Sequence, residues 1–248
     1  MISFIPQGRL GNFMFKAAAA IAYSIKYNIE FSMPSITNSQ KWNSVYYQHL
    51  VSPKWNNESK DNIFIQEKNL FKYDDILFKE EWRGKQIILD GYFQNVKYFK
   101  DYKETINKLL SIGYFSQGKV GIHVRRGDYL TIPDKHIVPT VDWYKKAMTF
   151  FPNYQFVFFS DDIKWCEDNF SDRDDCLFMK GFDEFTDFIT LSKCEHFINS
   201  SSTFSWMAAW LNCNPDKKVI TPAQWMTPRC TNQWTNELLL DEWIKLSV

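Results

Sequence analysis

The sequence has few cysteines, no surplus of charge of either sign and no phosphate-binding loop of the form G-x-x-x-x-G-K-[ST]. Its five cysteines are an odd set without a C-x-x-C pair, which is typical neither of a disulfide framework nor of a zinc site. Basic and acidic residues number 29 each, so the whole molecule has no attraction for nucleic acid. The missing loop argues against a nucleotide phosphotransferase. We expect a protein of a reducing compartment whose anion sites, if any, are local.

Long apolar runs are also missing. No stretch approaches the roughly 20 apolar residues that cross a bilayer. The chain starts with a short apolar segment and soon reaches Gly8 and Arg9, without the basic segment and long apolar run of a signal peptide. We expect a cytoplasmic protein that associates at most peripherally with the inner face of the membrane.

The length of 248 residues, with 45% hydrophobic and 23% charged residues, fits one large or two modest globular units. A segment rich in glycine and serine, Ser111 to Gly118, separates an apolar helix end from a new strand. We therefore predict an N-terminal domain over residues 1–115 and a C-terminal domain over residues 116–248.

The C-terminal part alternates strands and helices, which predicts a five-stranded, Rossmann-like parallel sheet covered on both faces. The predicted strands are Lys119–Arg125, Tyr154–Ser160, Cys176–Met179, Glu195–Asn199 and Lys217–Thr221. The predicted helices are Asp142–Phe150, Asp162–Asn169, Glu184–Cys194 and Thr203–Asn212. The fold class is thus α/β.

The N-terminal part is less regular. Ile2–Ile5 and Ile87–Leu89 are predicted strands, and Asn12 is the expected N-cap of a helix that reaches about Tyr27. Its buried face is predicted to contain Met14, Ala17, Ala18, Ile21, Ala22 and Ile25. Residues 37–75 have weak periodicity and are left unassigned.

Ligands of parallel sheets lie beyond the carboxyl ends of the strands, so the residues that follow each strand deserve inspection. His123 and Arg125 alternate with Val120, Ile122 and Val124 and end one strand on the opposite face. The planar guanidinium group of an arginine is well suited to a diphosphate, because it forms bidentate hydrogen bonds. A solvated salt bridge between Arg126 and Asp128 explains this motif about equally well.

Three more segments follow strands. In Ser160-Asp161-Asp162 a carboxylate could accept hydrogen bonds from ribose or guanine, although a helix cap explains it more simply. In Ser200-Ser201-Ser202-Thr203-Phe204, a hydroxyl-rich turn begins a helix whose N-terminus could bind phosphate. Gly8-Arg9-Leu10-Gly11-Asn12 forms a similar glycine-bearing loop before the first helix.

These segments and several others follow one another along the chain in a characteristic order. The chain contains Gly8-Arg-Leu-Gly-Asn12-Phe-Met-Phe15, Gly91-Tyr-Phe-Gln94, His123-Val-Arg-Arg-Gly-Asp-Tyr129, Phe159-Ser-Asp-Asp162 and Thr203-Phe-Ser-Trp-Met-Ala-Ala-Trp-Leu211, with a smaller similarity at Val219-Ile-Thr-Pro222 and Trp225. Together they resemble the bacterial α-1,2-fucosyltransferases of glycosyltransferase family 11 over nearly the entire chain.

The resemblance implies a GT-B-like fold of two Rossmann-like domains that face a cleft, with the nucleotide sugar on the C-terminal parallel sheet and the acceptor on the N-terminal side. It implies an inverting enzyme that moves L-fucose from GDP-β-L-fucose to the 2-hydroxyl of a terminal galactose on an oligosaccharide. It implies no cofactor and no metal ion.

The resemblance also implies roles for individual residues. The expected catalytic residues are Arg125 on the β-phosphate, Asn12 at the interdomain cleft and Asp128 as a candidate base, whose competing role is to hold the arginine loop. The expected donor-binding residues are Gly11, His123, Arg126, Tyr129, Ser160, Asp161, Ser201, Ser202, Thr203 and Phe204.

The chain departs from the family pattern at several positions. Phe13 and Lys16 stand where glutamines are usual, Met207 replaces a tryptophan, and Ser201 replaces an asparagine. The first two lie near the expected acceptor, so the linkage and the receiving sugar are less firmly implied than the donor.

Two other functions remain open from the sequence. Asp172-Arg173-Asp174 is a D-x-D sequence that could hold Mn²⁺ in a metal-dependent nucleotide-sugar transferase, although a solvated acidic turn explains it more simply. Aromatic residues make up 18% of the chain and would suit a noncatalytic glycan-binding module, although core packing explains them as well.

Overall fold

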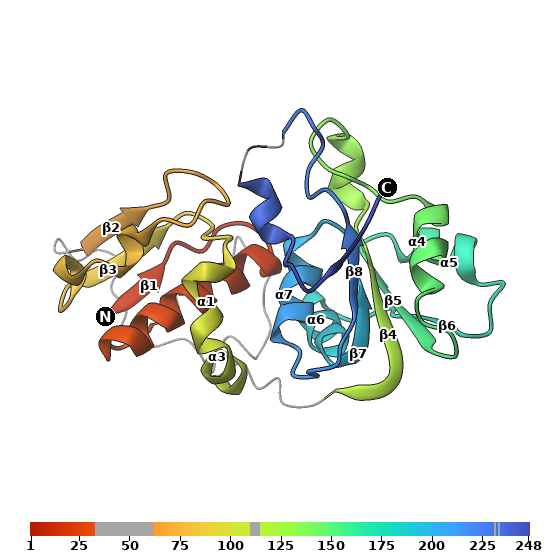
Figure 1. The fold of residues 1–248 in the computed structure, drawn as a ribbon, viewed down its shortest axis with the longest axis horizontal. Coiled ribbons are helices and arrows are strands. Elements are labelled where there is room, and N and C mark those ends of the chain that lie inside the picture. The colour runs from red at the N-terminus through yellow and green to blue at the C-terminus, as the bar shows by residue number, and fades with distance from the viewer. Residues whose placement is uncertain (33–61, 110–114, 231, 233) are drawn as a thin grey trace. The chain divides into compact units, whose positions relative to one another are not determined.

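The computed structural model describes residues 1–32, 62–109, 115–230, 232 and 234–248. The chain forms two compact units, Met1–Ile106 and Asn107–Val248, each with its own parallel sheet (Figure 1). The division falls before the boundary predicted from the sequence. Part of the predicted boundary segment, and most of the unassigned region 37–75, lie outside the described residues.

The N-terminal unit has a three-stranded parallel sheet in the order β1-β3-β2. Its strands are β1 (Ile2–Phe4), β2 (Asn62–Gln66) and β3 (Gln86–Asp90). Short 3₁₀ helices occupy Asp75–Phe78, Glu80–Trp82, Val96–Tyr98 and Lys100–Tyr102, and α3 (Lys103–Leu109) crosses the division between the units. The sequence predicted β1 and β3 but not β2, which begins within the unassigned region.

The helix α1 (Leu10–Tyr27) packs against β1. It begins at Leu10, with Arg9 as an extended N-cap that makes no side-chain capping bond, so the prediction that Asn12 is the cap is wrong. It is buried on nearly all sides up to Tyr23, whereas Ile25 is 36% exposed and does not belong to the buried face predicted for it. The run of alanines allows this close packing on several sides.

The C-terminal unit has a six-stranded parallel sheet in the order β6-β5-β4-β7-β8-β9. Its strands are β4 (Ser116–Val124), β5 (Gln155–Ser160), β6 (Cys176–Phe178), β7 (Cys194–Ile198), β8 (Val219–Pro222) and β9 (Ile244–Leu246). Its helices are α4 (Val141–Met148), α5 (Ile163–Phe170), α6 (Glu184–Ser192) and α7 (Thr203–Leu211). All predicted strands and helices of this unit have counterparts. Among the described residues, the edge strand β9 and two short 3₁₀ helices, Gly127–Thr131 and Thr235–Leu238, were not predicted.

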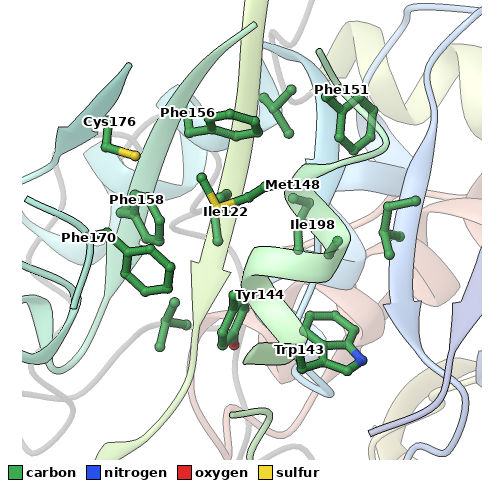
Figure 2. Close-up of a cluster of buried hydrophobic side chains, with 14 of the residues drawn as sticks. Ile122, Trp143, Tyr144, Met148, Phe151, Phe156, Phe158, Phe170, Cys176 and Ile198 are labelled. Carbon is green, nitrogen blue, oxygen red and sulfur yellow. The ribbon is translucent and has the colours of Figure 1, made fainter. Parts of the chain in front are cut away.

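Helices cover both faces of this sheet, with α4 and α5 on one side and α6 and α7 on the other (Figure 1). Val120, Ile122 and Val124 of β4 belong to the core that also contains Trp143 and Tyr144 of α4 (Figure 2). The alternation predicted for β4 is therefore confirmed. Because side chains alternate along a strand, His123 is directed to the opposite face, toward α7.

Candidate active site

The candidate site lies at the carboxyl edge of the C-terminal sheet. Strand β4 is flanked by β5 and β7, and all pair in parallel. The residues that follow these strands therefore emerge side by side, although they are far apart in the sequence.

Arg125 is the first residue after β4 and is 8% exposed. Its Nη1 lies 2.6 Å from Oδ2 of Asp161, and its Nη2 donates a hydrogen bond to Oδ1 of Asp128. The fold thus brings together three residues that the sequence singled out in two separate motifs. A buried guanidinium needs such partners, since removing them would leave an uncompensated charge.

Arg126 points to different partners. Its Nε lies 3.1 Å from Oδ2 of Asp162, and its guanidinium lies over the Trp165 ring, 4.2 Å from the centroid. Its backbone N–H donates to Oδ1 of Asp161 at 3.0 Å. The alternative of an Arg126–Asp128 salt bridge is not what the structure shows, because Asp128 pairs with Arg125.

The Ser160–Asp162 turn combines capping with these contacts. Oδ1 of Asp162 accepts the backbone N–H of Trp165 at 3.3 Å and so caps α5. Ser160 Oγ accepts the backbone N–H of Asp162 at 2.9 Å. The simpler expectation of a helix cap is confirmed for Asp162, whereas Asp161 is directed at Arg125.

Gly127 lies next to this turn. A Cβ atom at this position would lie 2.4 Å from Oδ2 of Asp161, which is already bound to Arg125. The glycine therefore permits the close approach of the β4 and β5 loops.

His123 is fixed by the loop before α7. Its Nδ1 lies 2.8 Å from Ser200 Oγ, and its ring stacks on Phe204 with centroids 5.0 Å apart. The hydroxyl of Tyr144 donates to the His123 carbonyl at 3.3 Å. Ser200 and Phe204 therefore set the orientation of the ring, while Tyr144 binds the backbone of His123.

The serine turn uses its hydroxyl groups within the protein. Ser202 is the N-cap of α7 and accepts the N–H of Phe204 at 3.4 Å. Ser201 Oγ donates to the carbonyl of Gln224 at 3.2 Å, and the carbonyl of Ser201 accepts the Tyr129 hydroxyl at 3.2 Å. Thr203 is the first residue of α7, whose positive dipole end lies at the same edge of the sheet.

The formal charges at this edge are unequal. Three carboxylates, those of Asp128, Asp161 and Asp162, pair with the two guanidinium groups. The Asp128 side chain is 56% exposed, against 18% for Asp161. Asp128 is therefore the partner that an anionic ligand could displace most easily from Arg125.

Gly11 and Asn12 belong to the N-terminal unit and lie in the first turn of α1, not in the loop before it. Oδ1 of Asn12 accepts a hydrogen bond from Nε2 of Gln94 at 2.8 Å. Gly8 has φ +80°, and a Cβ there would lie 2.5 Å from Nδ2 of Asn12. The loop after β3 thus binds the Asn12 side chain, and the lack of a side chain at Gly8 leaves room for it.

Lys16 and Phe13 were expected near an acceptor, but both side chains are buried. Nζ of Lys16 donates to the carbonyls of Ile5 and Gln7 at 2.7 Å each. Burial lowers the pKa of Lys16 to about 7, although the negative charges of Asp90 and Glu67 oppose the shift. Lys16 therefore fixes the loop before α1 from inside.

The D-x-D sequence lies at the opposite edge of the sheet. Asp172 and Asp174 are exposed in the turn between α5 and the amino end of β6. The intervening Arg173 binds Asp175 through Nε at 2.9 Å and Nη2 at 2.6 Å. In the part of the chain that the structure describes, no group of three or more metal-binding side chains is present. The placement does not favour a metal-bound diphosphate beside Arg125.

Two contacting residues were not identified from the sequence: Trp165 lies under Arg126, and His136 stacks on Tyr129. Gln94, which binds Asn12, belongs to a motif of the family resemblance, but no role was predicted for it. The i,i+3 spacing from Asp162 to Trp165 was a usable signal, since both fall on the first turn of α5. His136 had no such signal, because it lies in an irregular loop.

Among the described helices, none is long and apolar enough to cross a membrane.

Comparison with known protein families gives one match over almost the full chain. The model described as Glycosyl transferase family 11 matches residues 1–247. Among curated proteins, the O-antigen biosynthesis glycosyltransferase WbnK of Escherichia coli is 35% identical over 50% of this chain and 43% of its own length. An α-1,2-colitosyltransferase of Escherichia coli is 28% identical over 63% of this chain and 61% of its own length.

A galactoside α-(1,2)-fucosyltransferase 1 of Bos taurus is 36% identical over 37% of this chain and 29% of its own length. The chain thus aligns with less than two thirds of each of these relatives. Among solved structures, a mutant of Arabidopsis thaliana FUT1 in complex with GDP gives a TM-score of 0.54 at 12% identity, covering 94% of this chain and 72% of that one. POFUT1 in complex with GDP gives 0.52 at 11% identity, covering 89% and 97%. These structural likenesses support the α/β fold with parallel sheets.

Proposed function

This chain belongs to glycosyl transferase family 11, and on that premise we propose that it transfers L-fucose from GDP-β-L-fucose to the 2-hydroxyl of a terminal galactose, with inversion to an α-1,2 linkage. The observation that carries the proposal is the buried Arg125 at the carboxyl end of β4. The names of the relatives support the linkage, and the GDP complexes among the structural neighbours support the nucleotide.

The proposed chemistry places Arg125 on the β-phosphate of the donor. Breaking the bond between fucose C1 and the phosphate oxygen leaves a cationic sugar and adds negative charge to the leaving diphosphate. A guanidinium group in a buried position, together with the N-terminus of α7, stabilises this charge more as the bond lengthens. That difference between ground state and transition state is what lowers a barrier.

We assign Arg126 to the support of this loop, since it is bound to Asp162 and stacked on Trp165. His123, Ser160, Asp161 and Phe204 form the nucleoside side of the proposed site. Tyr129, Ser201, Ser202 and Thr203 form its phosphate side.

Asp128 is proposed to hold Arg125 in the absence of donor. Its pairing with Arg125 favours this role over that of the base that accepts the proton of the acceptor hydroxyl. The carboxylate oxygen that Arg125 already occupies is not available to the proton of an acceptor hydroxyl.

The N-terminal unit is proposed to carry the acceptor side, with Asn12 as its catalytic residue and Gly11 contributing to donor binding. The GT-B-like arrangement of two facing domains and the galactose-terminated acceptor remain predictions from the family. A cytoplasmic location, with at most peripheral association with the membrane, likewise remains a prediction.

Isothermal titration with GDP tests the donor site. We expect GDP to bind equally well with and without EDTA, and to lose binding in Arg125→Ala. Binding that requires Mn²⁺ would favour the metal-dependent transferase, and glycan binding without any GDP affinity would favour the noncatalytic module.

A transfer assay tests the reaction. We expect transfer from GDP-fucose to lactose, with the product identified as an α-1,2 fucoside by NMR. Because one relative is named as a colitosyltransferase, the nucleotide-activated form of colitose serves as the competing donor. A clear preference for it would replace fucose in the proposal while leaving the site unchanged.

A further inference from the structure

The Tyr129 ring connects Arg125 to two other parts of the chain. It stacks on the His136 ring with centroids 3.8 Å apart and an interplanar angle of 12°. The guanidinium of Arg125 lies over the same tyrosine, 5.1 Å from its centroid. The tyrosine hydroxyl donates to the Ser201 carbonyl at 3.2 Å. Tyr129 is therefore fixed at its rim by the serine turn and on its face by His136.

His136 is itself anchored by the segment after β8. It forms an isolated antiparallel bridge with Met226, and Thr227 N–H donates to the carbonyl of Lys135 at 3.1 Å. One residue earlier, Asp134 pairs with Arg229 at 2.9 Å. The imidazole is thus presented to Tyr129 by a loop tied down on both sides of the histidine.

We propose that His136 is a positioning residue for the transfer reaction: its ring holds Tyr129 flat, and Tyr129 in turn holds the Arg125 guanidinium in the orientation that the donor diphosphate requires. This inference rests on the proposed function. His136 touches neither of the reacting groups, so its contribution passes through Tyr129. The face of an aromatic ring attracts a guanidinium, so a displaced Tyr129 would displace Arg125 with it.

The protonation state of His136 matters to this arrangement. Burial lowers the pKa of His136 below its usual value, Arg125 and Lys135 lower it further, and Asp128 opposes them. The lowered pKa favours the neutral ring at pH 7. An imidazolium would repel Arg125 and attract Asp128, the carboxylate that pairs with it. Asp134 and Arg229 are the other charged groups of the tied loop and largely neutralise one another. We therefore expect activity to fall as the pH falls through the pKa of His136.

Two substitutions at His136 separate the ring from its charge. His136→Phe keeps a flat ring that cannot be protonated, whereas His136→Ala removes the stack. We expect His136→Ala to lower kcat/KM for GDP-fucose by about tenfold at pH 7.5, since small misplacements of a catalytic group have effects of this order or larger. His136→Phe is expected to retain wild-type kcat/KM at pH 7.5 within about twofold and to lack the acid limb of the wild-type pH profile.

Lys135→Ala is the matched control, because it removes a neighbouring charge and leaves the stack in place. It should keep activity at pH 7.5 and move the acid limb to higher pH, since Lys135 lowers the pKa of His136. Circular dichroism melts confirm that each variant is folded before its kinetics are compared.

The outcomes distinguish this inference from the proposed function. A folded wild-type protein without GDP binding or fucosyl transfer contradicts the proposed function itself. If the wild type transfers fucose and His136→Ala has the same kcat/KM, the positioning role is overturned. It is also overturned if His136→Phe loses as much kcat/KM as His136→Ala. An acid limb that persists unchanged in His136→Phe assigns the titration to another group and overturns the pH dependence.

Discussion

Replacing Asp128 with asparagine tests how the donor reaches Arg125. In the structure Arg125 is bound by Asp128 and Asp161, so a diphosphate must compete with a carboxylate for the same guanidinium. Asp128→Asn keeps the shape and an acceptor oxygen but removes the negative charge. We therefore expect GDP to bind more tightly to the variant than to the wild type.

The magnitude follows from the exposure of Asp128. Its side chain is 56% exposed, so an effective dielectric constant between the surface value of ~20 and that of water is appropriate. At an effective dielectric constant of ~40 and a charge separation of ~6 Å, the repulsion between the Asp128 carboxylate and one phosphate charge is about 1.4 kcal/mol. Removing it corresponds to roughly a tenfold gain in affinity, before screening by salt.

Titration calorimetry with GDP at low and high ionic strength measures this effect. The gain should shrink as salt increases, because the charges are partly solvated. Asp168→Asn is the matched control, since Asp168 is an ion-paired aspartate of α5 with a side chain 55% exposed, and it should leave GDP affinity unchanged.

Two results would refute this reasoning. Equal or weaker GDP binding by Asp128→Asn would show that the carboxylate does not compete with the donor. Loss of turnover with unchanged GDP affinity would instead identify Asp128 as the base, whereas full turnover across the pH range would exclude that role.

The remaining predictions concern other contacts. Arg125→Ala should lower kcat by ~10²–10³. Arg125→Lys should have a similarly low kcat, because an ammonium group cannot form the bidentate contact. Near-normal activity of the lysine variant in the fucosyl-transfer assay would contradict the bidentate contact. Gly127→Ala should weaken GDP binding in calorimetry, because its Cβ would displace Asp161, and unchanged affinity would mean that the turn adjusts freely. The pKa of Lys16 is about 7 in the folded chain and has its ordinary, higher value in the unfolded chain. The unfolded chain therefore binds one more proton between pH 7 and ~10, so the free energy of unfolding measured with urea should rise with pH over this range. Lys16→Met should remove that rise and the exposed Lys26→Met should not; a slope that survives in Lys16→Met contradicts the assignment.

The regular half of the fold could be predicted from the sequence. Val120, Ile122 and Val124 alternate with polar or small residues, and the first four predicted strands of the C-terminal unit are each followed by a helix with apolar spacing. Such local periodicity is enough to define a parallel sheet and its carboxyl edge. The candidate residues Arg125 and Asp161 followed from that edge, because each comes directly after a strand.

Other features depend on contacts that local sequence does not encode. Asn12 has the side chain of a good N-cap, yet Leu10 is buried and the helix begins there, without a side-chain capping bond. The edge strand β9 has only three residues and owes its conformation to pairing with β8. The pairing of Arg125 with Asp161 joins residues that follow different strands, so only the strand order could reveal it.

The adjacent arginines illustrate why a motif alone leaves roles unassigned. Both are basic, and both could bind phosphate on chemical grounds. The fold separates them: Arg126 is stacked on Trp165 and paired with the capping residue of α5, while Arg125 is paired with the displaceable carboxylate of Asp128. A ligand that recruits Arg126 must break a contact that also supports a helix, whereas one that recruits Arg125 need only displace an exposed side chain. The proposed donor site therefore centres on Arg125.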